Sequence, residues 1–184
     1  MKSEKDKMLD GKLYNAGDPE LTKERDNAHT LCQKYNQLNF LDYDGRKRIL
    51  EELLGSFEEP ITIEPPFYCD YGKNIQLGKN VYMNTNCIIL DVNIVKIGSN
   101  TKFGPLVQLY SATHPLEPEI RIKGDELGFP ITIGENVWIG GGVMINPSIT
   151  IGDHSVIGTG SVVTKDIPPK VFAAGNPCKI IKKI

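Results

Sequence analysis

The sequence predicts a mainly β protein built as a β-solenoid, in which the chain winds in stacked coils. An apolar residue recurs every six positions in most of the stretch from Leu77 to Pro168, and a second apolar or small residue stands four places after it. A six-residue period fits neither a helix, with about 3.6 residues per turn, nor a flat strand, with a period of about 2. It fits a coil that turns three corners per circuit.

Both residues of each unit are expected to point into the solenoid core, because they hold the same place in every repeat. The first of the two is Leu77, Met83, Ile97, Phe103, Ile133, Ile139, Ile145, Ile151, Ile157 and Val163. The second is Val81, Cys87, Thr101, Val107, Val137, Val143, Ile149, Ser155, Ser161 and Ile167.

The period breaks at two places. From Ile89 to Ile97 the spacing is eight, which predicts a two-residue bulge around Asp91-Val92-Asn93. From Leu109 to Ile133 the spacing is 24, so one coil carries about 18 extra residues, at 111–130. Insertions in a solenoid leave the coil as loops on one face and often carry function.

Residues 1–58 have a helical pattern and are expected to form a separate N-terminal segment. Met8, Leu9 and Leu13 mark a short first helix. Asp18-Pro19 is typical of a helix start, with a second helix to about residue 39. A third helix is expected after the residues 42–45, ending at Gly55.

The second predicted domain covers residues 59–184. It begins with an extended, proline-punctuated strand at 60–74 and continues as the solenoid with its inserted loop. A basic and apolar tail closes it after a Gly-Asn-Pro turn at 175–177.

Composition indicates an ordinary globular protein, with 40% hydrophobic and 24% charged residues. A net charge of −2 gives no general attraction to nucleic acid or to an anionic membrane. The chain has no apolar stretch of about 18 residues, and its charged start does not resemble a signal peptide. Four cysteines without a Cys-x-x-Cys pair favour reduced, packed thiols in a cytoplasmic protein.

Six segments together resemble the hexapeptide-repeat acyltransferases, and among them the maltose and galactoside O-acetyltransferases. They are PPFYCDYGKNIQLG at 65–78, VYMNTNCIILD at 81–91, ATHP at 112–115, VWIGGGVMINP at 137–147, VTKDIPP at 163–169 and AGNPCKIIKKI at 174–184. The resemblance implies a left-handed parallel β-helix and a homotrimer with active sites between neighbouring chains. It also implies acetyl-CoA as donor, a sugar hydroxyl as acceptor and no metal.

His114 is the expected catalytic base. Transfer of an acetyl group from a thioester to an alcohol requires removal of the alcohol proton, and a histidine with a pKa near neutrality suits that task. His114 stands at the root of the insertion and matches the catalytic histidine of the family. The other two histidines are expected to be structural: His29 lies in a helix away from the solenoid motifs, and His154 lies at a solenoid corner.

The resemblance places four residues at the acceptor: Asn84, Tyr82, Asp18 and Asp70. An amide donates and accepts together, as a sugar hydroxyl does, which suits Asn84 to that site. Asp18 has a competing role as a helix cap. A family carboxylate of the galactoside enzymes falls on Val92, which weakens a galactoside preference. The other asparagines of the repeats are expected to be corner residues with left-handed backbone: Asn80, Asn86, Asn100 and Asn136.

Glu126 lies in the insertion, where the galactoside enzymes carry a methionine. Two roles are open for it, the orientation of His114 or the binding of the sugar. A backbone carbonyl would orient the imidazole equally well.

The donor side follows from the same resemblance. The Gly141 N–H is the expected donor to the thioester oxygen, on which charge develops in the transition state. Trp138 is expected along the acceptor or pantetheine channel, or simply packed on the solenoid surface. The expected contacts to CoA come from the last coils and the tail: Thr159, Thr164, Lys165, Lys179 and Lys182.

Three other functions remain in view. A hexapeptide acetyltransferase of a xenobiotic or of serine fits the repeats, but the N-terminal helices and the short Thr113-His114-Pro115 loop favour sugar enzymes. A γ-type carbonic anhydrase needs three histidine ligands for zinc, and only His114 and His154 lie in the solenoid. A non-catalytic scaffold is disfavoured because His114 and Asn84 are present.

Overall fold

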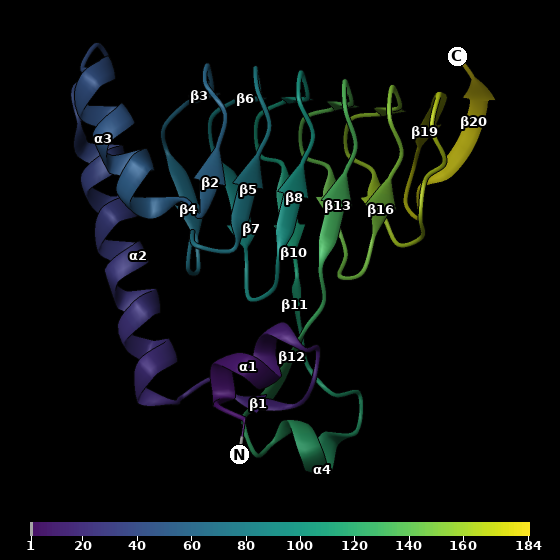
Figure 1. Ribbon diagram of the computed structural model, residues 1–184. Coiled ribbons are helices and arrows are strands. Elements are labelled where there is room, and N and C mark those ends of the chain that lie inside the picture. Colours follow the sequence, from purple (N-terminus) through teal and green to yellow (C-terminus); the bar gives the residue numbers. More distant parts are fainter. Residues whose placement is uncertain (1) are drawn as a thin grey trace.

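The structure is a computed structural model that describes residues 2–184, and its main body is a three-sided parallel β-solenoid (Figure 1). The chain passes from face 1 to face 2 to face 3 in every coil, and strands of successive coils pair in parallel. Face 1 contains β2 (Ser56–Phe57), β5 (Ile75–Leu77), β8 (Val95–Ile97), β13 (Ile131–Ile133) and β16 (Thr150–Ile151).

Faces 2 and 3 complete each coil. Face 2 contains β3 (Thr62–Ile63), β6 (Tyr82–Met83), β9 (Lys102–Phe103), β14 (Trp138–Ile139), β17 (Val156–Ile157), β19 (Val171–Ala174) and β20 (Lys179–Lys183). Face 3 contains β4 (Phe67–Cys69), β7 (Cys87–Leu90), β10 (Gln108–Tyr110), β15 (Met144–Ile145) and β18 (Val162–Val163). We call the turns between faces the 1/2, 2/3 and 3/1 edges. The first coil begins at β2, so the solenoid starts three residues before residue 59, the predicted start of its domain, and includes the stretch predicted as an extended entry strand.

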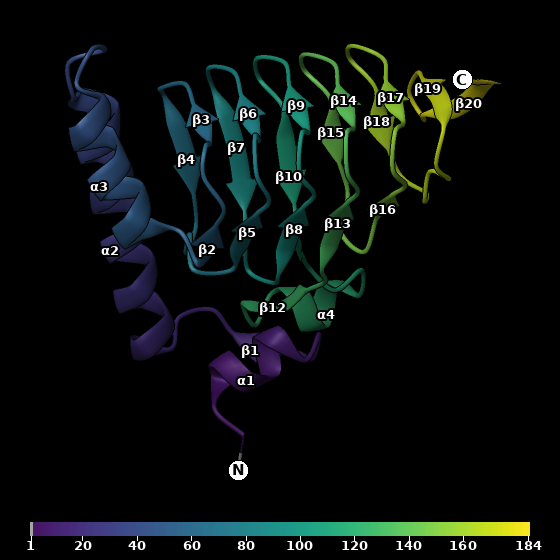
Figure 2. The ribbon, with the colours of Figure 1, turned by 45° about the horizontal axis from the view of Figure 1, so that its top comes forward.

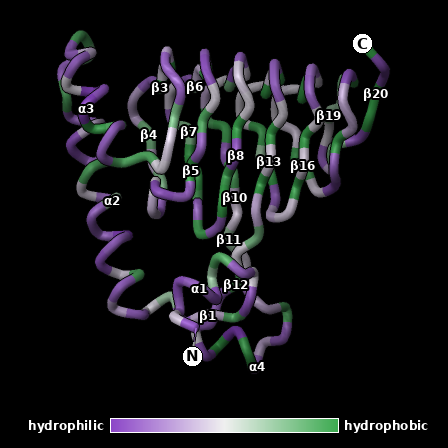
Figure 3. Tube along the Cα trace, viewed as in Figure 1, coloured by the Kyte–Doolittle hydropathy of each residue, from purple (hydrophilic) through white to green (hydrophobic). Residues whose placement is uncertain are grey.

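The solenoid core confirms the six-residue pattern. All twenty predicted inward residues are buried, each with at most 5% of its surface exposed. The three polar ones make internal hydrogen bonds; Thr101 Oγ1, for example, donates to the Gly134 carbonyl at 2.9 Å. Along the chain, apolar and polar residues alternate as strands and corners succeed one another (Figure 3).

The corner asparagines are also as predicted. Asn80, Asn86, Asn100 and Asn136 have φ between 52° and 62°, the left-handed region that asparagine tolerates better than other side chains. His154 has φ 61° and confirms its predicted corner position.

Three helices precede the solenoid: α1 (Glu4–Leu9), α2 (Pro19–Gln37) and α3 (Tyr43–Leu53). α2 and α3 cover the first coil (Figure 2), while α1 lies with the insertion below it. The predicted start of α2 is confirmed, because the Asp18 carboxylate accepts from the N–H groups of Glu20 and Leu21. Two predicted bounds were wrong: α1 ends before Leu13, and α3 begins at Tyr43 with Asp42 as its cap. None of the helices in residues 2–184 has the length and hydropathy needed to cross a membrane.

The insertion leaves the solenoid at the predicted place and is itself folded. It forms β11 (Ala112–Thr113), α4 (Pro118–Arg121) and β12 (Asp125–Gly128). β12 pairs antiparallel with β11 and with β1 (Tyr14–Asn15) of the N-terminal segment. A small separate core fills this unit, made of Met8, Tyr14, Leu21, Tyr71 and Val92.

The bulge at 91–93 joins this unit to the coils. Asn93 is buried, and its Nδ2 donates to three carbonyls, those of Met8, Leu9 and Gly128, at 2.9–3.2 Å. Since these carbonyls belong to α1 and to the end of β12, one amide holds the N-terminus, the insertion and the solenoid together.

Candidate active site

His114 lies on the 3/1 edge, directly after β11, and is exposed. Asp70 and Asp91 occupy the same edge in the two preceding coils, after β4 and β7. Neighbouring strands lie about 4.8 Å apart, so Asp70 is about 10 Å from His114 along the solenoid axis. The 3/1 edge thus aligns a histidine with two carboxylates.

A hollow of about 450 Å³ opens beside His114. Its lining is largely apolar and comes from the insertion and the N-terminal segment: Leu13, Thr113, His114, Pro115, Leu116, Glu117, Ile120 and Leu127. The histidine is therefore reachable from solvent and borders a cavity, as a general base must.

Glu126 does not hold His114. Its Oε2 accepts a hydrogen bond from Tyr14 Oη at 2.8 Å, and within residues 2–184 none joins the Glu126 and His114 side chains. The first of the two predicted roles is therefore not observed. The pairing of Thr113 with Leu127 nevertheless keeps Glu126 near His114. Burial, followed by this contact with Glu126, raises the pKa of Tyr14 and keeps its hydroxyl protonated.

Asp70 faces helix α2 and has a partner there that the repeat pattern does not indicate. His29 Nε2 lies 3.9 Å from Asp70 Oδ1, so the prediction that His29 stands away from the solenoid motifs was wrong. Burial raises the pKa of Asp70, while the nearby charges of His29 and Arg25 oppose that rise. The buried residues of α2 could have indicated this contact, because His29 lies next to Ala28 and Cys32, on the side of the helix that packs on the solenoid.

Asp91 points inward. It is fully buried, and its Oδ1 accepts from the N–H groups of Asp70 and Tyr71, while Oδ2 accepts from that of Asn74. Burial raises the pKa of Asp91 to about 7, against the opposing effect of backbone donors, of which the Tyr71 N–H is the foremost. Asp91 thus fixes the backbone that carries Asp70.

The 2/3 edge carries a second set of predicted residues. Asn84, Gly141 and Thr159 follow β6, β14 and β17 at this edge. Asn84 Oδ1 accepts from the Thr85 N–H at 2.7 Å, a contact that does not use its Nδ2 donor. A Cβ on Gly141 would lie 3.2 Å from Pro105 of the coil before, so a side chain fits here only tightly.

The predicted CoA residues lie around the last coils. Thr164 and Lys165 follow β18 on the 3/1 edge, whereas Lys179 and Lys182 are exposed on β20. Trp138 is 60% exposed on the outside of face 2, in register with Lys102 and Val156. Tyr82 pairs with Lys102 and so lies two coils before Trp138 on the same face. Within one chain, the predicted site residues are therefore divided mainly between the 3/1 edge and the 2/3 edge.

Face 3 separates these two edges, and its outer surface is largely apolar. The outward residues there are Tyr68, Ile88, Leu90, Gln108, Tyr110, Met144 and Val162. The outward residues of face 1 are polar by contrast: Gln76, Lys96, Thr132 and Thr150.

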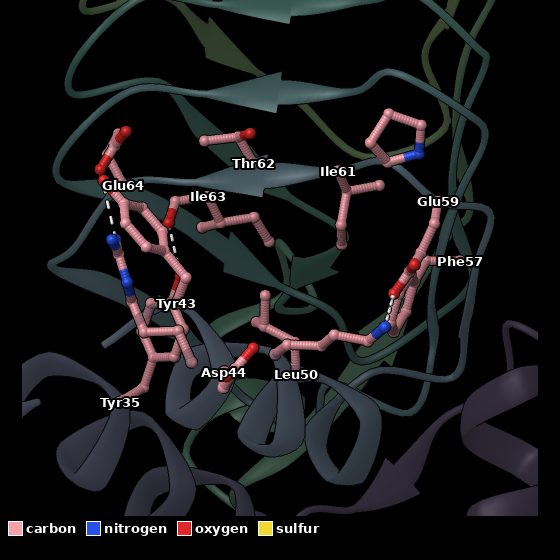
Figure 4. A pocket seen from close by; sticks show the side chains of 13 residues that line it. Tyr35, Tyr43, Asp44, Leu50, Phe57, Glu59, Ile61, Thr62, Ile63 and Glu64 are labelled. Carbon is pink, nitrogen blue, oxygen red and sulfur yellow. Dashed lines mark hydrogen bonds and ion pairs between the residues drawn. The ribbon is translucent and has the colours of Figure 1, made fainter. Parts of the chain in front are cut away.

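A further hollow, of about 290 Å³, lies between α3 and the first coil (Figure 4). Two ion pairs span it, Arg46 with Glu64 at 3.4 Å and Lys47 with Glu59 at 2.6 Å. It contains no histidine or cysteine and lies at the first strands of faces 1 and 2, away from His114. We interpret it as the seam that fastens α3 to the solenoid.

No three His, Cys, Asp or Glu side chains of residues 2–184 are grouped so as to hold a metal ion. The four cysteines carry no disulfide and are buried. Cys32 and Cys69, distant in sequence, have their Sγ atoms 3.6 Å apart.

Known proteins share both parts of this architecture. The family model of the maltose acetyltransferase hexapeptide capping motif matches residues 7–58, and that of the bacterial transferase hexapeptide matches residues 130–165. The galactoside O-acetyltransferase of Escherichia coli is 44% identical over 95% of this chain and 86% of its own length. The chain belongs to the maltose and galactoside O-acetyltransferase family.

Solved structures agree with this assignment. A maltose O-acetyltransferase from Clostridium difficile superposes with a TM-score of 0.98 at 51% identity, covering 100% of this chain and 98% of the other. A galactoside acetyltransferase in complex with coenzyme A gives a TM-score of 0.96 at 42% identity, covering 100% and 92%. The predicted left-handed β-helix is thereby confirmed, and the protein is an acyltransferase with acetyl-CoA as its cosubstrate.

Proposed function

We propose that this acetyltransferase moves the acetyl group of acetyl-CoA to a hydroxyl of a sugar, with His114 as general base. The active form is a homotrimer in the cytoplasm, with each site between two chains. The observation that carries the proposal is the position of His114 and Asn84 on opposite edges of face 3.

A ring of three chains with face 3 inward accounts for that division. In such a heterologous ring the 3/1 edge of one chain meets the 2/3 edge of the next. His114 of one chain then faces Asn84 of its neighbour, and the apolar residues of face 3 leave water. Both edges are used, and no chain has a complete site alone.

In the proposed reaction, the His114 imidazole removes the proton from the sugar hydroxyl as its oxygen attacks the thioester carbonyl carbon. Negative charge develops on the thioester oxygen, and the Gly141 N–H donates to it. The C–S bond then breaks, and the CoA sulfur leaves with the proton that the imidazolium returns. The acetyl group ends on the sugar oxygen, and His114 is neutral again.

The acceptor is bound by groups that fix hydroxyl directions. The carboxylates of Asp70 and Glu126 accept hydrogen bonds from hydroxyls, and Tyr82 and Asn84 contribute from the neighbouring chain. Tyr14 holds the Glu126 carboxylate at its β12 position. Asp18 acts as the cap of α2, the use its carboxylate has in the structure.

CoA lies in the groove between adjacent solenoids. Thr159 and Thr164 offer hydroxyls along its pantetheine arm, and Trp138 offers an exposed indole. Lys165, Lys179 and Lys182 attract its phosphates, as point charges without the bidentate geometry of arginine.

The test is an acceptor panel with acetyl-CoA. Release of the CoA thiol is followed for maltose, glucose, galactosides and non-sugar alcohols, and NMR identifies the acetylated hydroxyl. We expect thiol release and an O-acetyl sugar with at least one sugar. Turnover confined to serine or to a xenobiotic amine or alcohol would contradict the proposed acceptor class.

A further inference from the structure

Cys32 of α2 and Cys69 of β4 are in direct contact, with their Sγ atoms 3.6 Å apart. The sulfurs of a disulfide lie about 2.05 Å apart, so these two atoms need to approach each other by about 1.5 Å to form a bond. The other two cysteines, Cys87 and Cys178, contact no thiol within residues 2–184. The chain therefore places one pair of thiols close to bonding distance.

The helix and the strand that carry the two thiols are tied to each other beside them. Asn36, one turn after Cys32, donates from Nδ2 to the Phe67 carbonyl at 3.0 Å and accepts the Phe67 N–H on Oδ1 at 2.8 Å. Phe67 stands two residues before Cys69, so both side chains point to the buried side of β4. The two thiols thus meet across a packed interface between regular elements.

A hollow of about 470 Å³ between α2 and β4 reaches this pair. Both cysteines line it, although only 2% of the surface of Cys32 and 3% of that of Cys69 is exposed. On the α2 side the hollow is bordered by Gln33 and Gln37, which are exposed and belong to no strand face. Hydrogen peroxide is much smaller than this space, so it reaches thiols that larger reagents do not.

The two thiols differ in reactivity. The hydrogen bond between them lowers the pKa of Cys32, against the effect of burial. The same hydrogen bond, together with burial, raises the pKa of Cys69. Since the thiolate is the nucleophile, Cys32 is the thiol that attacks an oxidant, and Cys69 is the one that completes the disulfide.

We propose that Cys32 and Cys69 are a redox modification site, at which a peroxide forms a disulfide between α2 and β4. The Cys32 thiolate attacks a peroxide oxygen, the O–O bond breaks, and Cys32 becomes a sulfenic acid, while the released hydroxide takes up the Cys32 proton as water. Cys69 then attacks the Cys32 sulfur, and the displaced hydroxide leaves with the Cys69 proton as a second water. Two thiols and one peroxide thus give a disulfide and two waters, and a dithiol reverses the change.

The modification affects the acceptor site through Asp70, which follows Cys69 directly in the chain. This consequence rests on the proposed function, in which the Asp70 carboxylate binds the sugar. An approach of the sulfurs by about 1.5 Å draws β4 toward α2 and displaces Asp70 from its position in the reduced chain. Catalysis is sensitive to displacements of about 1 Å, so oxidation weakens the use of the sugar and reduction restores it.

The chemical test oxidises the purified, reduced full chain with hydrogen peroxide, blocks the remaining thiols with N-ethylmaleimide in urea, and identifies linked peptides by mass spectrometry. We expect a Cys32–Cys69 cross-link, with two of the four cysteines protected from the blocking reagent and both recovered after dithiothreitol. Cys32→Ser and Cys69→Ser form no cross-link. Cys87→Ser is the matched control, because Cys87 is equally buried without a thiol neighbour in the described chain, and it forms the cross-link as the wild type does.

The kinetic test measures the KM for the sugar that the acceptor panel identifies, before and after oxidation. We expect oxidation to raise this KM about tenfold in the wild type and in Cys87→Ser, but not in Cys32→Ser, and dithiothreitol to restore it. Four free thiols after peroxide, or a Cys32 sulfinic acid without a cross-link, would overturn the site. A cross-link that leaves the KM unchanged would overturn its effect on Asp70. A chain that forms the cross-link but acetylates no sugar would confirm the site and contradict the proposed function alone.

Discussion

The 1/2 edge and the 3/1 edge each recur once per coil of the solenoid, but they differ in the residues that they carry. At the 1/2 edge each coil from the second onward turns on one residue with left-handed backbone: Asn80, Asn100, Asn136, His154 and Lys170. At the 3/1 edge the coils depart from one another, with Asp70, the 91–93 bulge and the insertion that carries His114. Regular corners build the scaffold, and irregular corners hold the groups that the reaction needs.

The first prediction uses one histidine from each edge. His114→Ala removes the base, and we expect kcat to fall about 10²- to 10⁴-fold with an unchanged circular dichroism spectrum. His154→Asn places a residue that tolerates left-handed backbone at a corner, so its kcat stays near that of the wild type. Equal activity of the two variants would remove the functional difference between the edges.

The second prediction concerns the joint at the bulge. Asn93→Ala leaves the carbonyls of Met8, Leu9 and Gly128 without their shared donor, at a cost of about 1–3 kcal/mol in the free energy of unfolding. Urea unfolding measures that loss, and limited proteolysis should show earlier cleavage in the insertion. Asn80→Asp, at an exposed corner, is the control; an equal loss there would contradict the special role of Asn93.

The third prediction is a pH dependence of stability. Burial raises the pKa of Asp91 to about 7, so the folded chain holds this proton more tightly than the unfolded chain does. The contribution of Asp91 to stability therefore falls as the pH rises from about 4 to about 7. The pKa of Asp70, whose backbone N–H donates to Asp91, is raised as well.

Urea unfolding between about pH 4 and pH 7 measures this slope. Asp91→Asn carries no titrating group there and should flatten the curve. A variant with the slope of the wild type would assign the pH dependence to other groups.

The smallest effect is expected at the regular edge. Asn100 has φ 62°, where alanine costs about 1–2 kcal/mol and glycine adopts the conformation freely. Asn100→Ala should therefore lower the free energy of unfolding more than Asn100→Gly, with acetyl transfer unchanged in both. The reverse order in urea unfolding would contradict backbone strain as the cause.

The repeated parts of the molecule were predictable because every coil must bury side chains at the same two positions and turn at the same corners. Ten copies of one pattern predict the core and the corners, and Asp18-Pro19 predicts the start of α2 from local geometry alone. The position of the insertion was also predictable, since a break in a period is as visible as the period.

The contacts between the solenoid and the rest were not predictable in the same way. The approach of His29 to Asp70, and of Cys32 to Cys69, depends on how α2 crosses the first coil, which no local pattern determines. Tyr14 and Glu126 meet across 112 positions of sequence. Asn93 resembles a corner asparagine in sequence, and only its burial reveals a different use.

The central claim is that His114 and Asn84 of one site come from different chains. His114→Ala and Asn84→Ala are each expected to be nearly inactive, and the two are co-expressed with different tags so that mixed trimers can be purified. In a ring of three, every mixed trimer regains one intact site, so an equal random mixture should recover about a quarter of the wild-type activity. Mixed trimers that stay as inactive as the two parents would contradict a site shared between chains.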